Sequence, residues 1–450
     1  MARRLAILLL LGALSCGPKK PPPVVITSPE DLTEEHLNAL VRELTPLVEE
    51  AAGKRFEEVP HARLGRLADL QTILEDEFLL IMGRMYDVPD YVLRQLAERS
   101  RASAPGVVGK FGVQTRVLYL SPEAVGAVTM GAGLAPERAG DVARLVMAHE
   151  MAHALQAQEE GLDVLHSGVR DMEQLNGLRG VTEGHANFVE KRVAEKLGLR
   201  EVTTALNLSQ GWGDEGPVDL GSFELWAIYG QGMHFVEHHY EEGGMDRVWA
   251  LLRDPPPSTT MLFRPETYAP ALPDPVDYSA AMEGVEEVLT EGRWVAVHSR
   301  VGELTLRAEA LRMDQEALDE ILRHIEDGFV KEAFKPDRTV RIRILDFDDP
   351  QWPLAYIDLL STQTAPTPES TEHGTRLWRD EVGPWTGVEA DRAIHRVAGP
   401  SGLVRFEVTE VWIARGDRLI VVQAEGFRPG IRMERAVERL LRQLEALEAP

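Results

Sequence analysis

The sequence has 450 residues, of which 44% are hydrophobic and 27% charged, a composition that is typical of folded globular chains and excludes a disordered or fibrous protein. Its 73 acidic and 48 basic residues give a formal net charge of −25. Because phosphate groups bind to clustered basic side chains, and the sequence has no long basic run, we expect no nucleic-acid partner.

The N-terminal segment predicts export. Two arginines precede an apolar run at residues 5–14, which suits a signal peptide and is too short to span a membrane. Residues 13–16 resemble the lipobox of bacterial lipoproteins, in which the cysteine becomes the lipid-modified first residue of the mature chain. We therefore expect a signal peptide over residues 1–16, lipid attachment to the membrane at Cys16, a proline-rich tether over residues 17–30, and a location in the bacterial cell envelope, at the outer membrane or the periplasmic face. A secreted protein with an incidental cysteine is the alternative.

Residues 31–100 predict a helical N-terminal region. Thr33 is expected to cap a first helix, and a second helical stretch covers residues 64–101. Nothing in these residues distinguishes an inhibitory prodomain from a helical support. The pattern then changes, because residues 106–111 and 115–120 are short β-rich runs flanked by glycine, and these predict a hairpin.

The central part of the chain, residues 101–275, predicts a mainly helical domain. Its helices are expected at residues 136–158, 180–197 and 223–241. The third helix is expected to stop at the glycine pair 243–244.

The last part, residues 276–450, predicts an α+β domain of unknown role. Residues 301–334 are expected to be mostly helical, and residues 431–447 to form a closing amphipathic helix. Strands are expected at residues 339–347, 355–360, 403–414 and 418–424. The tripeptide at residues 415–417 matches a cell-adhesion motif, but a hairpin turn is the favoured interpretation. The predicted fold class is α+β, with a mainly helical domain over residues 101–275 that carries a small antiparallel sheet.

The strongest chemical signal is an H-E-x-x-H motif on the first of the three central helices. His149 and His153 are four residues apart and therefore lie on one face, so both imidazoles can reach a single metal ion. Glu150 lies beside them, where it can accept a proton from metal-bound water. Zinc is the usual metal for two histidines plus a carboxylate with an open position. The other interpretation, two histidines on a buried helix, requires a separate hydrogen-bond partner for each imidazole.

The third ligand decides the class of zinc site. Glu159 lies six residues after His153, where one protease family has its third ligand, but no turning glycine precedes it and the continuing helix carries it away. Glu183 is better placed, near the start of the next helix and on the same stripe as Glu190. Gly184 is small enough to let that helix pack closely against the first.

Together these residues resemble a gluzincin metallopeptidase, the thermolysin-like group with a downstream glutamate ligand. The pattern H-E-x-x-H-A-L-Q at residues 149–156 and the pattern E-G-x-A at residues 183–186 are similar to those of bacterial envelope metallopeptidases, and shorter matches include residues 256–259 and 301–304. The chain departs from the family pattern at Arg264, which stands where a histidine would precede Pro-Glu.

The resemblance implies a zinc metalloendopeptidase that hydrolyses peptide bonds in a peptide or protein substrate. One Zn²⁺ per chain would be held by His149, His153 and Glu183. Glu150 would act as the general base toward the zinc-activated water.

Three further features would assist this chemistry. Tyr229 is the candidate for a second group that stabilises the oxyanion, although a tyrosine in the core is an equal interpretation. Asn187, four residues after Glu183, is the candidate for a hydrogen bond to a zinc-binding histidine. The hairpin near residues 117–120 would supply the strand against which an extended substrate aligns by strand addition.

Two other functions are compatible with the sequence. One is a catalytically silent envelope lipoprotein that keeps the zinc fold for binding or assembly, and the other is a zinc amidase that acts on cell-wall peptides. Retention of Glu150 argues against the silent protein, because a purely structural metal needs no base. His234 and His238 repeat the four-residue spacing without an adjacent glutamate, so we expect no second metal site on that pattern.

Overall fold

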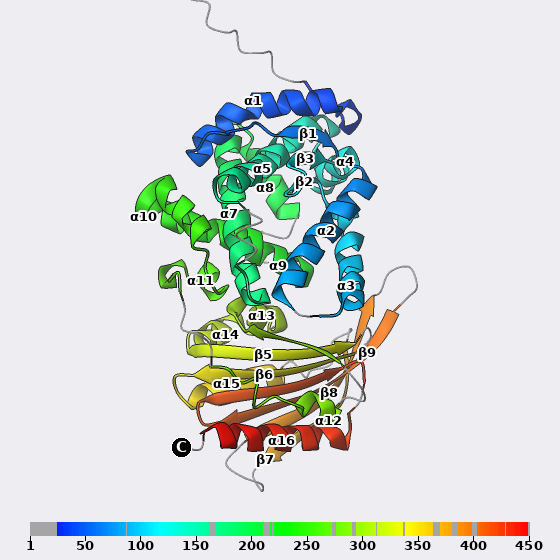
Figure 1. The fold of residues 1–450 in the computed structure, drawn as a ribbon, viewed down its shortest axis with the longest axis vertical. Helices are drawn as coiled ribbons and strands as arrows, with labels where there is room; N and C mark the ends of the chain where they lie inside the picture. Colours follow the sequence, from blue (N-terminus) through cyan, green and yellow to red (C-terminus); the bar gives the residue numbers. More distant parts are fainter. Residues whose placement is uncertain are drawn as a thin grey trace, which may run out of the picture. The chain divides into compact units, whose positions relative to one another are not determined.

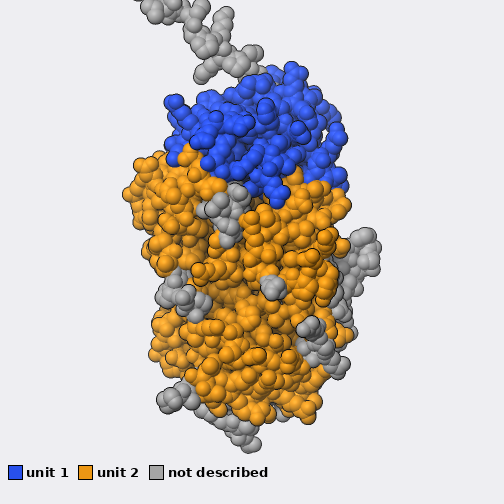
Figure 2. All heavy atoms as spheres, in the orientation of Figure 1, with its two compact units in different colours: residues 1–70, 103–158, 189–206 blue, residues 71–102, 159–188, 207–450 orange. Residues whose placement is uncertain are grey.

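The computed structural model describes residues 25–86, 88–161, 168–209, 217, 220–271, 276–289, 294–311, 313–335, 338–362, 370–379, 386–397, 403–427 and 429–448. The expected signal peptide, Cys16 and most of the expected tether lie outside the described residues. Contacts divide the chain into two compact units, of which the first contains residues 1–70, 103–158 and 189–206 and the second contains the rest (Figure 2). Because both units are built from separate segments, they cross the boundaries predicted near residues 100 and 275.

The first unit combines helices with a small sheet. Its elements are α1 (Glu34–Ala52), β1 (His61–Leu64), β2 (Gly109–Gly112), β3 (Val117–Leu120), α4 (Pro122–Gly131), α5 (Ala139–Glu159), the end of α7 (Met172–Leu197) and most of α8 (Arg200–Ser209) (Figure 1). As expected, α1 begins after Thr33, whose side chain accepts a hydrogen bond from the backbone N–H of His36. Asn38 of α1 then holds β1, because its amide exchanges two hydrogen bonds with the backbone of Ala62.

The sheet of the first unit has the strand order β1-β3-β2. β2 and β3 form the predicted antiparallel hairpin, and β1, which the sequence analysis missed, pairs with β3 in parallel. Strand β3, at Val117–Leu120, therefore has both edges paired, and the hairpin strand at the edge of this sheet is β2. Alignment of a substrate along the hairpin stays a prediction, which concerns the edge of β2.

Helix α5 is buried on nearly all sides. Its apolar residues Leu145, Met147 and Met151 are fully buried, and so are most of its alanines. His149 and Glu150 lie on this helix with only 9% and 7% of their surface exposed. Buried polar side chains on such a helix need partners, because an unsatisfied polar group in the interior is costly.

The second unit begins with helices. They are α2 (Leu67–Met85), α3 (Asp90–Ala102), most of α7, α9 (Leu220–Leu225), the π-helix η4 (Trp226–Gln231), α10 (Gly232–Arg253), α11 (Thr260–Phe263) and α12 (Val285–Leu289). The predicted helical stretch at residues 64–101 is therefore two helices, with Pro89 in the break. Helix α10 consists of two helical segments, because helical geometry is interrupted at the glycine pair 243–244, where the sequence predicted a stop.

The second unit ends in a seven-stranded antiparallel sheet. Its elements are β4 (Val295–Arg300), α13 (Glu303–Glu309), α14 (Gln315–Leu322), β5 (Ile325–Lys335), β6 (Arg338–Phe347), α15 (Gln351–Thr362), β7 (Ser370–Arg379), β8 (Thr386–Val397), β9 (Leu403–Arg415), β10 (Arg418–Glu425) and α16 (Ile431–Glu448). The strand order is β4-β5-β6-β10-β9-β8-β7. The turn between β9 and β10 contains Gly416 at φ 60°, which confirms the hairpin expected at residues 415–417.

Both faces of this sheet are covered. Side chains alternate along the strands, so that Ile342 and Ile344 of β6 face α12 and α16 whereas Leu345 and Phe347 face α14 and α15. Figure 1 shows α16, in red, lying along the sheet. The observed class is α+β, as predicted.

Two predicted elements of this region are wrong. Residues 355–360 are part of helix α15, and the buried positions Pro353, Tyr356 and Ile357 follow the helical spacing rather than a strand alternation. The end of the predicted helical stretch at residues 301–334 is strand β5. Strands β4, β7 and β8 were not predicted.

Candidate metal centre

His149 and His153 of α5 face each other across one helical turn. Their Nε2 atoms are 3.1 Å apart, and their rings meet in a T-shaped arrangement. Two nitrogen ligands of one tetrahedral zinc ion would be about 3.3 Å apart, given Zn–N bonds of about 2.0–2.1 Å. The separation of the two imidazoles therefore fits a shared metal ion.

The other ring nitrogens lie next to side-chain oxygens. His153 Nδ1 lies 2.9 Å from Gln156 Oε1, and His149 Nδ1 lies 3.5 Å from a carboxylate oxygen of Glu190. When each Nδ1 gives its hydrogen to the neighbouring oxygen, each Nε2 is left with a lone pair that can bind a metal ion.

Glu183 completes this group. One ligand atom from each of His149, His153 and Glu183 lies within 4.8 Å of the others. Helix α7 carries Glu183 and, two turns later on the same face, Glu190. The same helix therefore supplies a carboxylate to the group and a carboxylate that orients His149.

Glu150 is fixed by the edge strand β2. Its Oε2 accepts a hydrogen bond of 2.6 Å from the backbone N–H of Phe111. Gly109 of the same strand lies so close that a Cβ there would overlap Val146 and come within 3.0 Å of Glu150 Cγ. The close approach needs a glycine, and it places the carboxylate of Glu150 against a backbone donor.

Helix α7 packs against α10 through glycines. A Cβ on Gly184 would overlap the backbone of Gly232, and a Cβ on Gly232 would overlap the backbone of Gly180. Gly184 was predicted to let α7 pack closely against α5, but its close contact is with α10. These glycines let the backbones of α7 and α10 touch directly beside Glu183.

Asn187 and Tyr229 are joined, but not in the predicted way. Asn187 Nδ2 donates a hydrogen bond of 3.2 Å to the backbone oxygen of Tyr229, in the π-helix η4. The sequence analysis expected Asn187 to contact a zinc-binding histidine. In the described residues, Glu190 lies next to His149 and Gln156 next to His153, and neither was predicted in this role. The Tyr229 ring packs on the apolar cluster of Phe223, Ala227, Ile228 and Leu304, in line with the alternative reading as a core tyrosine.

Arg264 has a structural partner. Its guanidinium lies 3.2 Å from the buried carboxylate of Glu303 and also donates to the backbone oxygen of Leu322. Glu303 in turn pairs with Arg307. Arg264 therefore ties its loop to α13, and this accounts for the arginine at a position where a histidine was expected.

A second buried carboxylate fixes the beginning of α7. Glu173 Oε1 accepts hydrogen bonds from Ser258 Oγ at 2.9 Å and from the hydroxyl and backbone N–H of Thr259. Thr259 Oγ1 also accepts from the backbone N–H of Leu304, and a Cβ on Gly302 would overlap the Glu173 carboxylate. The two short motifs at residues 256–259 and 301–304 thus meet at Glu173, which the sequence analysis did not identify.

The titration of Glu173 gives a testable pH dependence. Burial raises the pKa of Glu173 from 4.5 to about 7, although the hydrogen bonds from Thr259 and Ser258 oppose the shift. The folded state therefore keeps a proton that the unfolded state loses, so the free energy of unfolding falls as the pH rises from about 4.5 to about 7, by at most ~1.4 kcal/mol per pH unit. Glu173→Gln retains a carbonyl acceptor and does not titrate.

Urea unfolding of the two proteins between about pH 5 and about pH 8 measures this contribution. We expect Glu173→Gln to gain stability relative to the parent as the pH rises, while the other carboxylates affect both proteins equally. A constant difference between the two proteins across this range would contradict the assignment.

Five further histidines lie between residues 166 and 239. His185 is fully buried against Trp249 and His234 is exposed, whereas His166 lies outside the described residues. His238 forms a second close group, but with His239 and Glu242 rather than with His234, and the ligand atoms of these three residues also lie within 4.8 Å of one another. Among the described residues, two groups can therefore hold a metal ion.

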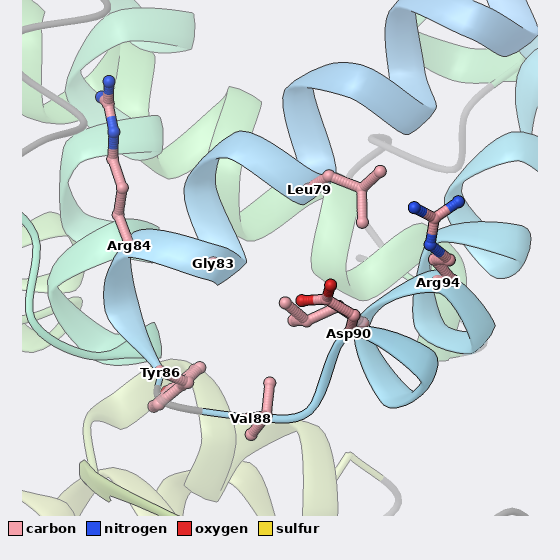
Figure 3. A pocket seen from close by; sticks show the side chains of 8 residues that line it. Leu79, Gly83, Arg84, Tyr86, Val88, Asp90 and Arg94 are labelled. Atoms are coloured by element: carbon pink, nitrogen blue, oxygen red, sulfur yellow. The ribbon is translucent and has the colours of Figure 1, made fainter.

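A surface hollow of about 550 Å³ is formed by α2 and α3 (Figure 3). Leu79 and Leu93 line it together with Asp90, whereas the side chains of Arg84 and Arg94 extend away from each other. Residues of the H-E-x-x-H motif do not contribute to it, and its polar groups do not converge on one point.

Comparison with family models gives no match for this chain, and comparison with curated proteins gives no relative. The likeness to gluzincins therefore rests on the motif residues themselves. In the described part of the chain, no helix is both long enough and apolar enough to cross a membrane.

Proposed function

We propose that the protein is a zinc metalloendopeptidase in which His149, His153 and Glu183 hold the metal and Glu150 is the general base. The observation that carries the proposal is the grouping of one ligand atom from each of His149, His153 and Glu183 within 4.8 Å, with the two Nε2 atoms 3.1 Å apart. The buried carboxylate of Glu150 beside them supports a catalytic role, since a structural metal would not need it.

The residues of the chain have distinct tasks in this proposal. When bound, zinc would lower the pKa of a water toward ~7 and polarise a carbonyl oxygen. Glu150 would accept the proton of that water at its carboxylate and later deliver it to the leaving amine. The backbone N–H of Phe111 would hold the carboxylate of Glu150 in position for this transfer. Glu190 and Gln156 would keep both Nε2 atoms available as ligands.

The location of the protein is a separate proposal that rests on the sequence. Residues 1–16 would direct export, and lipid attached to Cys16 would anchor the protein in the bacterial cell envelope. A protease held there would act on peptides or proteins of the same compartment.

Cleavage of a mixed-sequence quenched peptide library by residues 17–450 tests the function. We expect cleavage that a chelator abolishes and that added zinc restores. Purified cell wall is the parallel substrate, because release of cell-wall peptides without cleavage of the library would identify the amidase instead. Tightly bound zinc with no hydrolysis of either substrate would favour the silent lipoprotein.

Glu183→Ala is expected to lose the bound zinc, because two histidines alone leave the ion without its third protein ligand. Glu195→Ala is the matched control. Glu195 is an exposed residue on the same helix, and its carboxylate pairs with Arg200. Zinc content after dialysis, measured by atomic emission, should be near zero for the first variant and unchanged for the second. Full zinc retention by Glu183→Ala would mean that the third ligand is another residue.

A further inference from the structure

Helix α10 carries a second group of side chains that could bind a metal ion, His238, His239 and Glu242. His239 Nδ1 lies 2.7 Å from Glu242 Oε2, and His238 Nε2 lies 3.5 Å from Glu242 Oε1. The ligand atoms of the three residues lie within 4.8 Å of one another. His239 is almost completely buried, whereas 51% of the Glu242 side chain is exposed, so the group is rigid on one side and open to solvent on the other.

The other nitrogen of His239 lacks a partner. In the described residues, His239 Nε2 is buried and makes no hydrogen bond. Its ring meets Phe235 and Tyr268 in T-shaped contacts with centroids 4.7 and 5.2 Å away. If Nδ1 donates its hydrogen to Glu242, a lone pair is left on Nε2 among aromatic rings without any donor.

A metal ion on Nδ1 removes this difficulty. The imidazole hydrogen then lies on Nε2, and an N–H beside aromatic rings is favourable where a lone pair is not. A cation in contact with Nδ1 and Glu242 therefore accounts for the orphaned nitrogen of His239.

The backbone favours a cation at the same place. Helical geometry breaks directly after Glu242, because Gly243 has φ −152° and Gly244 has φ 66°. The group thus lies in the last turn of a helical segment, where backbone carbonyl groups lose their partners and the helix dipole is negative. The neighbouring Glu241 adds a further negative charge.

We propose that His238, His239 and Glu242 form a second divalent metal site, for zinc or a cation of similar preference for imidazole and carboxylate. Two imidazoles and a carboxylate with solvent at the open side are a ligand set that zinc accepts. The ion would fix the end of the helical segment before the kink of α10. This site is independent of the H-E-x-x-H group and of the proposed peptidase activity.

Arg247 is the competing partner of Glu242. Its Nε lies 3.9 Å from Glu242 Oε2, a weak contact, and its guanidinium also lies over the Tyr268 ring at 5.2 Å. Arg247 therefore has a second contact to keep when an ion takes its place beside the carboxylate.

The test uses residues 17–450 carrying His149→Ala and His153→Ala, so that the first group cannot contribute. Zinc is titrated by calorimetry, and cobalt by its visible absorption, which reports nitrogen and oxygen ligands without any activity measurement. We expect one ion per chain. His238→Ala and Glu242→Ala alter exposed or half-exposed side chains, and each should weaken binding at least about tenfold. His234→Ala, an exposed histidine one turn earlier, should leave binding unchanged.

Absence of ion binding in this background would overturn the proposal. Binding that His238→Ala and Glu242→Ala affect no more than His234→Ala would overturn it equally, because the ion would then be held elsewhere. Circular dichroism of each variant without metal establishes that the helical fold is retained, and His239→Ala is compared only if it passes that check.

Discussion

Glu150→Gln is expected to leave zinc binding intact and to abolish peptide hydrolysis. The amide has the same shape as the carboxylate, and its oxygen can still accept the hydrogen bond from the Phe111 N–H. It cannot accept a proton from water, and a positioned general base contributes about 10²–10⁴-fold to the rate. We therefore expect kcat to fall by at least about 10²-fold at unchanged zinc content.

Glu159→Gln is the matched control for this variant. It makes the same chemical change at the end of the same helix, at the position considered and rejected as the third ligand. Zinc content and kcat should both stay at the parent values. An active Glu150→Gln would remove Glu150 from the mechanism, and loss of zinc from Glu159→Gln would reopen the assignment of Glu183.

Gly184→Ala is expected to cause the largest loss of stability among single methyl additions to α7. The new Cβ would overlap the backbone of Gly232, which cannot move aside as the end of a flexible side chain can. The two helices must separate, and overpacking of this kind typically costs about 1–3 kcal/mol, occasionally more. Because Gly184 directly follows Glu183, the same shift should weaken zinc binding.

Thermal unfolding and zinc competition measure the two effects of Gly184→Ala. Gly131→Ala is the control, because Gly131 is also a glycine within a helix, at the end of α4, and a Cβ there meets nothing within 4 Å. The control should unfold at or slightly above the parent temperature, since alanine favours a helix more than glycine does. A Gly184→Ala protein as stable as the control would show that the contact between α7 and α10 is looser than described.

The sequence analysis was most successful where one helix contains the whole signal. The spacing of His149, Glu150 and His153 is local, so the helix alone brings both imidazoles to one side. Glu183 was found because it lies on a recognisable stripe of the next helix. Gln156 and Glu190 lay within the same two patterns, but their contacts with the histidine rings depend on how the helices meet and on side-chain rotamers.

Elements were mispredicted where charge or proline disguised the pattern. Strand β5 has its inward face interrupted by Lys331, which is buried in an ion pair with Glu286 at 2.6 Å, and the alternation was therefore not recognised. The sequence analysis did not identify Glu173. Its hydrogen-bond partners Ser258 and Thr259 lie far away along the chain, so no local pattern could reveal them.

The strand order of the large sheet determines when this part of the protein can become stable. β6 pairs with β10, and between them the chain contains α15 and the strands β7, β8 and β9. The apolar cluster on one face is closed by α16, which follows β10. The centre of the sheet therefore forms only after β10 has been synthesised, and such distant pairings make folding slow. A chain that lacks β10 and α16 would leave the edge of β6 unpaired and the cluster open, which makes early termination or C-terminal trimming far more damaging than the same loss from an exposed tail.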